Sequence, residues 1–150
     1  MNDSNENVID EFIEKMGLMS QSDGLPRIAG RILAVLIMYD EPYSFSQLSE
    51  RLAVSRGSVS TNTRLLVHLG MIERVTKRGE RQDYFKLKEN PYLSLMQGIE
   101  ARTTHATDVI EQTQNQLLAN DPSISGAQQR LTEMKTFYQS FKSAIQDLTS

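Results

Sequence analysis

The sequence predicts a mainly helical protein that carries one small β-hairpin. Apolar residues recur at every third or fourth position through most of the chain, which is the period of a helix with one buried face. Between residues 71 and 87 the pattern changes to short alternating runs on either side of Gly79, which is typical of two strands joined by a turn. Two further helical patterns fill residues 91–150, so the hairpin separates short helices from long ones.

The bulk composition excludes several classes of protein. A chain of 150 residues has room for one domain, or for a small domain with a helical appendage. It contains no cysteine, which excludes disulfides and thiolate metal sites. No apolar run approaches the ~20 residues of a membrane span, and the acidic, polar start is unlike a signal peptide. We therefore expect a cytoplasmic protein.

The net charge of −3 conceals an uneven distribution. Residues 1–24 contain one Lys or Arg against six Asp or Glu, and residues 91–150 contain four against six. Residues 25–90 contain eleven against seven, which is an excess of +4. A basic middle between acidic ends is typical of a nucleic-acid-binding segment within a soluble protein.

Two helices are predicted before residue 43. The first covers residues 8–19 and is followed by a loop at residues 20–24. Its apolar residues share one face, namely Val8, Ile9, Phe12, Ile13, Met16 and Met19. The second helix begins near Pro26, whose missing N–H costs nothing in a first helical turn, and it ends at residues 40–42.

A short third helix and a capped fourth helix follow. Ser44 and Gln47 have the spacing of a capping box, and the third helix stops near residues 53–54. Ser55 can cap the fourth helix, which ends at Gly70. The turn between the two helices is short, and its Val54 is expected to fill the core between them.

The first half of the fourth helix is rich in residues that form helices poorly, because their side chains compete for backbone hydrogen bonds. These residues are Ser58, Ser60, Thr61, Asn62 and Thr63. Val59, Leu66 and Leu69 or Gly70, with Thr63 alongside, are expected to face inward. A polar surface helix with a good cap is one explanation. The other is a surface whose short hydroxyl groups and arginines approach DNA closely.

The hairpin has predicted strands at residues 71–77 and 82–87, joined by a turn at residues 78–81. Four cations gather near its tip, namely Arg74, Lys77, Arg78 and Arg81. A solvated turn explains this only in part, since a hairpin needs no charge at its tip. The functional interpretation is a wing that inserts Arg78 or Arg81 into the minor groove.

This order of helices and hairpin is that of a winged helix-turn-helix. Its recognition helix, over residues 55–70, is expected to enter the major groove with its N-terminus first. The wing, over residues 74–87, is expected to lie at the minor groove. The predicted DNA-binding residues are Arg56, Ser58, Ser60, Thr61, Arg64, Lys77, Arg78 and Arg81.

Residues 91–150 predict two long helices, separated at residues 121–123. The first repeats small and apolar residues at Met96, Ile99, Thr103, Ala106, Ile110, Thr113 and Leu117. The second does so at Ala127, Leu131, Met134, Tyr138, Phe141, Ile145 and Leu148. A repeat of seven residues packs helices side by side, either in a hairpin or across a dimer.

Residues 24–87 resemble the winged-helix domain of MarR-type transcriptional regulators, and among these the GbsR-like subgroup. The matching stretches are GLPRIAGRIL (24–33), SFSQLSERLAVSRGSVSTNTRLLVHLGMIERV (44–75) and KRGERQDYF (77–85). The resemblance implies that residues 55–70 are the recognition helix and that Arg81 is the wing arginine. It also implies that the helices before and after the winged domain build a homodimer.

Two positions depart from the pattern of these regulators. Ala53 stands where such turns often have Gly, which predicts a turn that any residue can adopt. Thr63 stands where the helix often buries an aliphatic residue. It predicts either a looser core or a hydroxyl bonded back to its own helix.

No catalytic or metal-binding constellation is predicted. His68 and His105 are the only histidines, and the carboxylates are scattered, so we expect neither an enzyme nor a bound metal or cofactor. A group of four aromatic residues could hold a quaternary ammonium ion by cation–π contact, as GbsR-type regulators that sense choline would require. The group is Tyr39, Tyr43, Phe45 and Tyr92. Ordinary core packing is the competing explanation.

Three segments are predicted: an N-terminal dimerisation helix (1–23), a winged DNA-binding domain (24–90) and a C-terminal dimerisation hairpin (91–150). The predicted function is a homodimeric, sequence-specific transcription regulator. It would bind an inverted-repeat operator in double-stranded DNA and could respond to a small-molecule effector. The alternative is a winged helix used only for protein–protein interaction.

Overall fold

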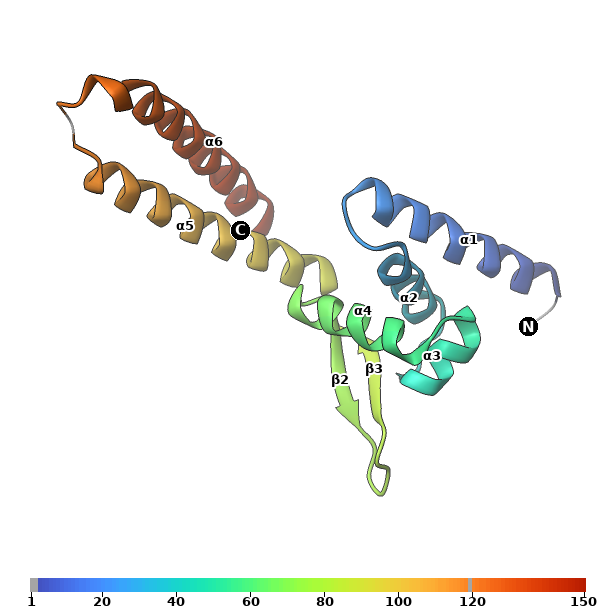
Figure 1. Cartoon of the computed structure of the whole chain (residues 1–150). Coiled ribbons are helices and arrows are strands. Elements are labelled where there is room, and N and C mark those ends of the chain that lie inside the picture. Colours follow the sequence, from blue (N-terminus) through green and yellow to red (C-terminus); the bar gives the residue numbers. More distant parts are fainter. Residues whose placement is uncertain (1–2, 119) are drawn as a thin grey trace. The chain divides into compact units, whose positions relative to one another are not determined.

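The computed structural model describes residues 3–118 and 120–150 and divides the chain into two compact units. The first unit ends at Pro91, and the second begins at Tyr92. Figure 1 labels the elements of both units. Within the described residues, no helix is long and apolar enough to cross a bilayer.

The first unit contains four helices and a small sheet, which confirms the predicted fold class. Its helices are α1 (Asp3–Ser22), α2 (Arg27–Met38), α3 (Phe45–Leu52) and α4 (Arg56–His68). Its strands are β1 (Tyr43–Ser44), β2 (Ile72–Thr76) and β3 (Asp83–Leu87). The sheet is antiparallel with the order β1-β3-β2. The hairpin of β2 and β3 projects away from the helices of this unit as a wing (Figure 1).

Two features of the first unit differ from the prediction. Strand β1 was not predicted, because its two residues form a strand only by pairing with Phe85 and Tyr84 of β3. Helix α1 extends into the predicted loop (20–24) and ends at Ser22. Its Ser20 is buried against Gly30 of α2, where a Cβ atom would collide with the Ser20 side chain and the Met16 carbonyl. Tertiary packing therefore continues the helix through a polar stretch.

The core of the first unit joins every helix of the winged motif to the sheet. Its side chains with no exposed surface include Ile32, Leu48, Val59, Leu66, Ile72 and Phe85. Val59 and Leu66 are two of the residues predicted to face inward from the fourth helix. Val54 is half-buried, so the turn contributes less to this core than expected.

Both predicted caps are present. Ser44 accepts a hydrogen bond from the Gln47 backbone N–H at 3.2 Å, and the Gln47 side chain accepts one from Ser44 N at 2.9 Å, which completes the capping box. Ser55 accepts one from Ser58 N at 3.1 Å at the start of α4. Each cap pairs a backbone N–H that the first helical turn leaves without a partner.

The expectation for Ala53 is wrong. Ala53 has φ 55° and ψ 45°, which is the left-handed conformation that glycine adopts most easily. Two backbone bonds hold it there: Ala53 N donates to Glu50 O at 3.3 Å, and Val54 N donates to Ser49 O at 3.1 Å. Packing of α3 against α4 thus imposes a conformation that costs alanine about 1 kcal/mol.

Thr63 bonds back to its own helix, which is one of the two predicted outcomes. It is 1% exposed, and its Oγ1 donates to Val59 O at 2.8 Å. Asn62 does the same from a buried position, where its Nδ2 donates to Ser58 O at 2.8 Å. These two polar residues of α4 are therefore part of the packed interior.

Substitution of Thr63 tests this local bonding. Thr63→Val keeps the shape and removes only a hydroxyl whose acceptor already serves the helix, so the free energy of unfolding should change by less than about 1 kcal/mol. Thr63→Ser removes a buried methyl group and should cost about 1 kcal/mol. Urea unfolding at fixed chain concentration measures both, with Thr61→Ser as the exposed control. A loss above about 2 kcal/mol in Thr63→Val would show that the hydroxyl is essential.

The second unit is a pair of long helices, α5 (Pro91–Gln116) and α6 (Ser125–Thr149), with the short helix η1 (Pro122–Ile124) before α6. Asp121 caps η1 by accepting from Ser123 N at 2.9 Å and from Ser123 Oγ at 2.7 Å, which lowers the pKa of Asp121. Polar side chains link the two helices: Gln114 Nε2 donates to Thr132 Oγ1 at 3.0 Å, and Gln146 Nε2 donates to Glu100 Oε1 at 3.1 Å.

Three of the seven residues in the predicted apolar repeat of α6 lie at the surface. Ile145 is buried, and Leu131 and Tyr138 are half-buried. The three exposed residues of the repeat and Phe137, which the repeat did not include, form a set that we call the α6 stripe: Met134, Phe137, Phe141 and Leu148. Helix α6 thus has a wider apolar surface than the pairing with α5 covers.

Candidate nucleic-acid interface

Helix α4 presents the predicted polar residues at its surface to different degrees. Arg56, Thr61 and Arg64 are exposed, whereas Ser58 and Ser60 are half-buried. The Ser58 hydroxyl accepts from Ser55 Oγ at 2.9 Å, and the Ser60 hydroxyl accepts from Arg64 Nη2 at 3.3 Å. Both serines therefore have local partners, while Arg56 and Thr61 have no hydrogen bond to another described side chain. The side chains of Arg56 and Thr61 can therefore bind another molecule without breaking a hydrogen bond to a described side chain.

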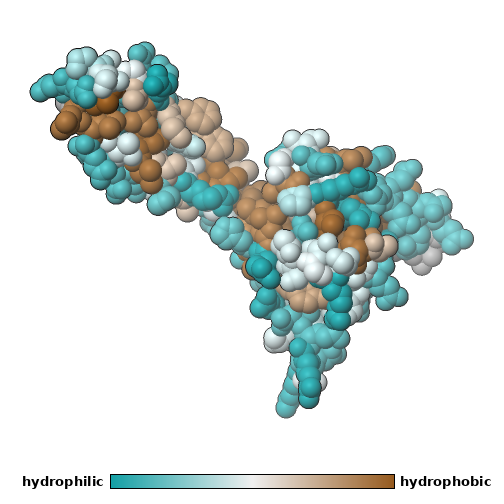
Figure 2. Space-filling model, in the orientation of Figure 1, coloured by the Kyte–Doolittle hydropathy of each residue, from teal (hydrophilic) through white to brown (hydrophobic). Residues whose placement is uncertain are grey.

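The wing is a tight hairpin with a charged tip. Gly79 has φ 81°, and Glu80 N donates to Lys77 O at 3.0 Å across the turn. Arg78 and Arg81 are exposed on either side of Gly79 and Glu80. The wing surface is hydrophilic down to its tip (Figure 2). The turn is held by this backbone hydrogen bond, so the side chains of Arg78 and Arg81 are not needed to form it.

Tyr84 stiffens the base of the tip. Lys77 Nζ lies 4.1 Å from the centroid of the Tyr84 ring, within cation–π range. The Tyr84 hydroxyl donates to Glu80 Oε2 at 2.6 Å, and this hydrogen bond raises the pKa of Tyr84. Lys77 and Glu80 are thereby held in place beside the free arginines.

The cations of residues 25–90 fall into two groups. Five form ion pairs with carboxylates: Arg27 and Arg31 with Glu14, Arg51 with Asp10, Arg74 with Asp83, and Lys86 with Glu73. Six have no carboxylate partner among the described residues, namely Arg56, Arg64, Lys77, Arg78, Arg81 and Lys88. All but Lys88 are predicted DNA-binding residues. Within residues 25–90, the uncompensated positive charge therefore lies on α4, on the wing and at Lys88, which follows the wing.

The sequence analysis did not single out Lys88, and it grouped Arg74 with the cations of the wing tip although Arg74 is paired with a carboxylate. Lys88 follows β3, away from the hairpin tip that drew attention to the others, and no sequence signal singles it out. Arg74 was counted among the tip cations, but Arg74 Nε lies 3.6 Å from Asp83 Oδ2 and its guanidinium lies 5.8 Å from the centroid of the Phe85 ring. Arg74 therefore braces the wing.

Of the four aromatic residues predicted to hold a cation, Tyr39 and Tyr43 lie next to each other. The Tyr39 and Tyr43 ring centroids are 6.1 Å apart, whereas the Phe45 ring packs against Phe85, with centroids 5.1 Å apart. Arg51 already lies over the Tyr39 ring at 6.0 Å, and the Tyr39 hydroxyl donates to Glu6 at 3.3 Å. Burial, followed by the charge of Glu41, raises the pKa of Tyr43. Tyr92 belongs to the other unit, and the ligand role of these residues stays a prediction.

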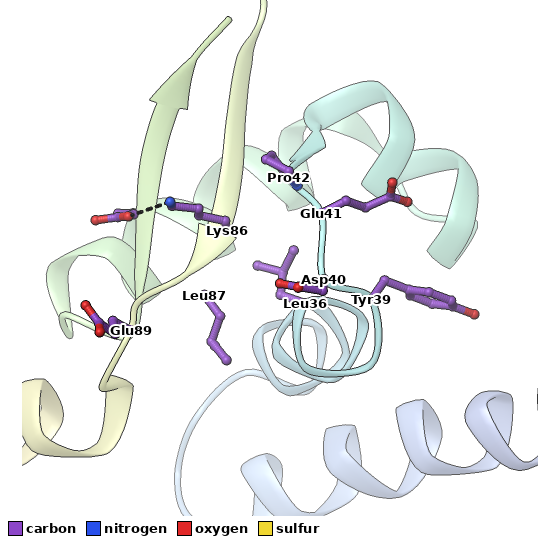
Figure 3. Close-up of a pocket in the computed structure, with 9 residues that line it drawn as sticks. Leu36, Tyr39, Asp40, Glu41, Pro42, Lys86, Leu87 and Glu89 are labelled. Atoms are coloured by element: carbon purple, nitrogen blue, oxygen red, sulfur yellow. Dashed lines mark ion pairs between the residues drawn. The ribbon is translucent and has the colours of Figure 1, made fainter.

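A cavity of about 500 Å³ lies beside Tyr39 in the first unit. Figure 3 shows Leu87 reaching toward the helix that carries Leu36. Carboxylates outnumber cations in its lining, which also includes Asp40, Glu41, Pro42, Glu73, Lys86 and Glu89. Glu73 and Lys86 neutralise each other at 3.4 Å, so the remaining charge is negative and disfavours an anion.

The histidines have no metal-binding neighbourhood. His68 and His105 are both exposed, and residues 3–118 and 120–150 contain no group of three or more His, Cys, Asp or Glu that could hold a metal ion.

Comparisons with known proteins agree with this geometry. Residues 23–82 match the model of the MarR family. The chain is 43% identical over 83 residues to the HTH-type transcriptional regulator MmpR5 of Mycobacterium tuberculosis, covering 55% of this chain and 50% of that protein. It is 28% identical over 87 residues to the HTH-type transcriptional repressor OpcR of Bacillus subtilis, covering 58% and 47%. The chain spans about half the length of these curated relatives.

A solved structure matches nearly the whole chain. The crystal structure of a transcriptional regulator superposes with a TM-score of 0.82 at 32% identity, covering 94% of this chain and 95% of that one. The match thus includes both the winged unit and the two long helices. From the family match, this structural likeness and the winged fold, we conclude that the chain belongs to the MarR family of winged-helix transcriptional regulators.

Proposed function

We propose that the chain is a homodimeric, sequence-specific DNA-binding transcription regulator. Helix α4 enters the major groove, and the wing over residues 74–87 contacts the minor groove. The observation that carries this proposal is the distribution of ion pairs, because five of the six cations of residues 25–90 that have no carboxylate partner among the described residues lie on α4 and the wing. Such cations gain most from binding a phosphate group, since no ion pair within the protein is lost when they bind it.

The surface of α4 supports a division of roles. Arg56 and Arg64 supply charge, and either can pair with a guanine through two donors. The exposed Thr61 hydroxyl, with the partly engaged hydroxyls of Ser58 and Ser60, can contact bases or phosphates at close range. Lys77, Arg78 and Arg81 contact the backbone and the minor groove, where they add affinity for any sequence.

The dimer would form through the terminal helices. Helix α1 buries Ile9 and Ile13 against α2 but leaves Val8 at 60% and Met19 at 59% exposure. In the second unit, Ile110 and Ile145 are the only fully buried apolar side chains among the described residues. A core of this size does not stabilise a helix pair by itself, whereas the exposed α6 stripe provides apolar surface for a second copy.

A two-fold dimer of this kind would read an inverted repeat, with half-site centres about one helical turn, ~34 Å, apart. We place the chain in the GbsR-like subgroup of the family, on the strength of the three matching stretches within residues 24–85. We also propose that it acts in the cytoplasm, where its operator would be accessible.

A cationic small molecule is the effector that the first unit would accommodate. The cavity beside Tyr39 has a net negative lining, and the Tyr43 ring lies next to the Tyr39 ring, over which Arg51 already lies. Thermal unfolding with tetramethylammonium chloride, compared with sodium chloride at equal ionic strength, measures such binding. Equal melting temperatures in the two salts would exclude a quaternary ammonium effector.

Binding to DNA should be selective and strongly salt-dependent. Selection of duplexes from a random pool should yield an inverted repeat, and affinity for it should fall about 500-fold between about 50 mM and about 200 mM salt if five phosphate contacts release their counterions. A mobility-shift titration measures both properties. Absence of a salt effect, or equal affinity for a random duplex, would exclude the proposal.

A protein–protein interaction module is the alternative, in which the cations only keep the surface soluble. Size-exclusion chromatography with and without the selected duplex distinguishes the two functions. The regulator elutes as a larger complex with DNA, whereas the interaction module elutes unchanged.

A further inference from the structure

Arg31 of α2 connects three helices at the edge of the winged motif. Its Nε donates to Glu14 Oε1 of α1 at 3.1 Å, and its Nη2 donates to Leu52 O, the last residue of α3, at 3.0 Å. Its side chain is 18% exposed, so these contacts are largely shielded from water. Neither DNA-facing surface described above includes Arg31.

The Leu52 carbonyl is a point of weakness in the helix-turn-helix. The last carbonyls of a helix have no partner within the helix, and this one directly precedes Ala53 in its left-handed conformation. A charged donor forms a stronger hydrogen bond with such a carbonyl than water does. The Arg31 contact therefore offsets the cost of a turn that alanine adopts reluctantly.

A second ion pair ties the same end of α3 to α1. Arg51 Nη2 lies 2.7 Å from Asp10 Oδ1, one helical turn before Glu14. Helix α1 thus contacts the end of α3 through two carboxylates, one directly through Arg51 and one through Arg31. A small hollow of about 220 Å³, lined by both arginines, both carboxylates and Ala53, lies beside these contacts.

We propose that Arg31 is a positioning residue for DNA recognition. Through Leu52 O it holds the turn between α3 and α4, and so the direction in which α4 projects. Through Glu14 it makes that direction depend on α1, one of the helices assigned to the dimer. This inference rests on the proposed DNA-binding function and adds a residue that lies away from the DNA.

The matched variants are Arg31→Gln and Arg27→Gln. Both remove one positive charge that is paired with Glu14, but only Arg31 contacts Leu52. In Arg31→Gln, affinity for the selected duplex should fall about tenfold, whereas affinity for a random duplex should change less than twofold, because a misdirected α4 still carries its cations. Arg27→Gln should keep the ratio of the two affinities. Arg31→Lys, which keeps the charge but reaches only one partner, should fall between them.

A second substitution, Ala53→Gly, should restore the sequence preference that Arg31→Gln loses. Glycine adopts the left-handed conformation without steric cost, so the turn then needs less help from Arg31. The double variant Arg31→Gln/Ala53→Gly should recover the affinity ratio to within about threefold of the unaltered protein. Amide hydrogen exchange of Ala53 and Val54 should be faster in Arg31→Gln than in Arg27→Gln, which reports the turn directly.

The outcomes separate the inference from the proposed function. If the unaltered protein does not prefer the selected duplex, the proposed function fails. If it does, but Arg31→Gln and Arg27→Gln lose the same share of the preference, the effect is one of charge and the positioning role is wrong. A drop in melting temperature in Arg31→Gln with an unchanged affinity ratio would likewise overturn it.

Discussion

Replacing Arg78 and Arg81 together with alanine is expected to weaken DNA binding about 10- to 100-fold, by similar factors for the selected and the random duplex. Both side chains are exposed at the wing tip and have no carboxylate partner among the described residues. Their loss therefore removes contacts with DNA and no contact within the fold. The slope of log K against log salt should fall by about two, one for each lost phosphate contact.

The control for this prediction is Lys86→Ala in the same hairpin. It removes one positive charge, but Lys86 is paired with Glu73 at 3.4 Å, so its contribution to DNA binding should be small. Mobility-shift titrations at several salt concentrations compare the two variants. An equal loss in both would mean that net charge, and not the wing tip, governs binding.

Substitutions in α4 should behave differently from those in the wing. Arg64→Ala and Thr61→Ala are expected to relax base preference at individual positions of the operator, at a cost of about 1–3 kcal/mol for a base-contacting arginine. If these variants and Arg81→Ala weaken binding in the same way across all sequences, the division between reading helix and wing is wrong.

Replacing Phe137 and Phe141 of α6 with aspartate is expected to dissociate the dimer, with an increase of at least about 100-fold in the dimer dissociation constant. The two rings are stacked, with centroids 6.1 Å apart, and are 64% and 42% exposed in the single chain. In a dimer they would be buried, and each aspartate would then place a charge in an apolar contact. In the single chain the same charges remain in water and leave the helix intact.

Gln139→Asp is the matched control, because Gln139 is exposed on the same helix and lies on the side away from the α6 stripe. Sedimentation velocity over a range of chain concentrations measures the dissociation constants, and circular dichroism checks the helices. Operator binding should weaken as the dimer dissociates, since one winged unit can bind only one half-site. If the double variant keeps the molar mass of the Gln139→Asp protein, the α6 stripe is not the dimer surface.

Local sequence patterns were sufficient to predict the order of the helices and strands and many residues of the candidate interface. Ser44 with Gln47, and Ser55 with Ser58, form caps within three or four residues, so chain neighbours alone determine them. The hydroxyl-rich start of α4 was also readable, and the structure divides it into interior residues such as Thr63 and exposed ones such as Thr61. The hairpin was predicted from its alternating pattern on either side of Gly79, which has φ 81° in the turn.

Contacts between residues far apart in the chain could not be predicted from the sequence. Ala53 was expected to avoid the left-handed conformation although such turns often have Gly at this position, but the packing of α3 against α4 imposes it. The repeat of α6 predicted which residues are apolar, yet a helix with two apolar faces does not reveal which of them its neighbour covers.

What the sequence by itself determined is therefore the set of helices, the wing and the residues with the chemistry to contact DNA, because caps, turns and periodicity act over a few residues. Only the tertiary structure decided which cations remain free for DNA. Arg51 pairs with Asp10, 41 positions away, and Arg31 with Glu14, 17 positions away, whereas Arg78 and Arg81 meet no carboxylate among the described residues. Charges attract over distances that folding alone creates, so a sequence shows which charges exist and the fold decides which of them are neutralised.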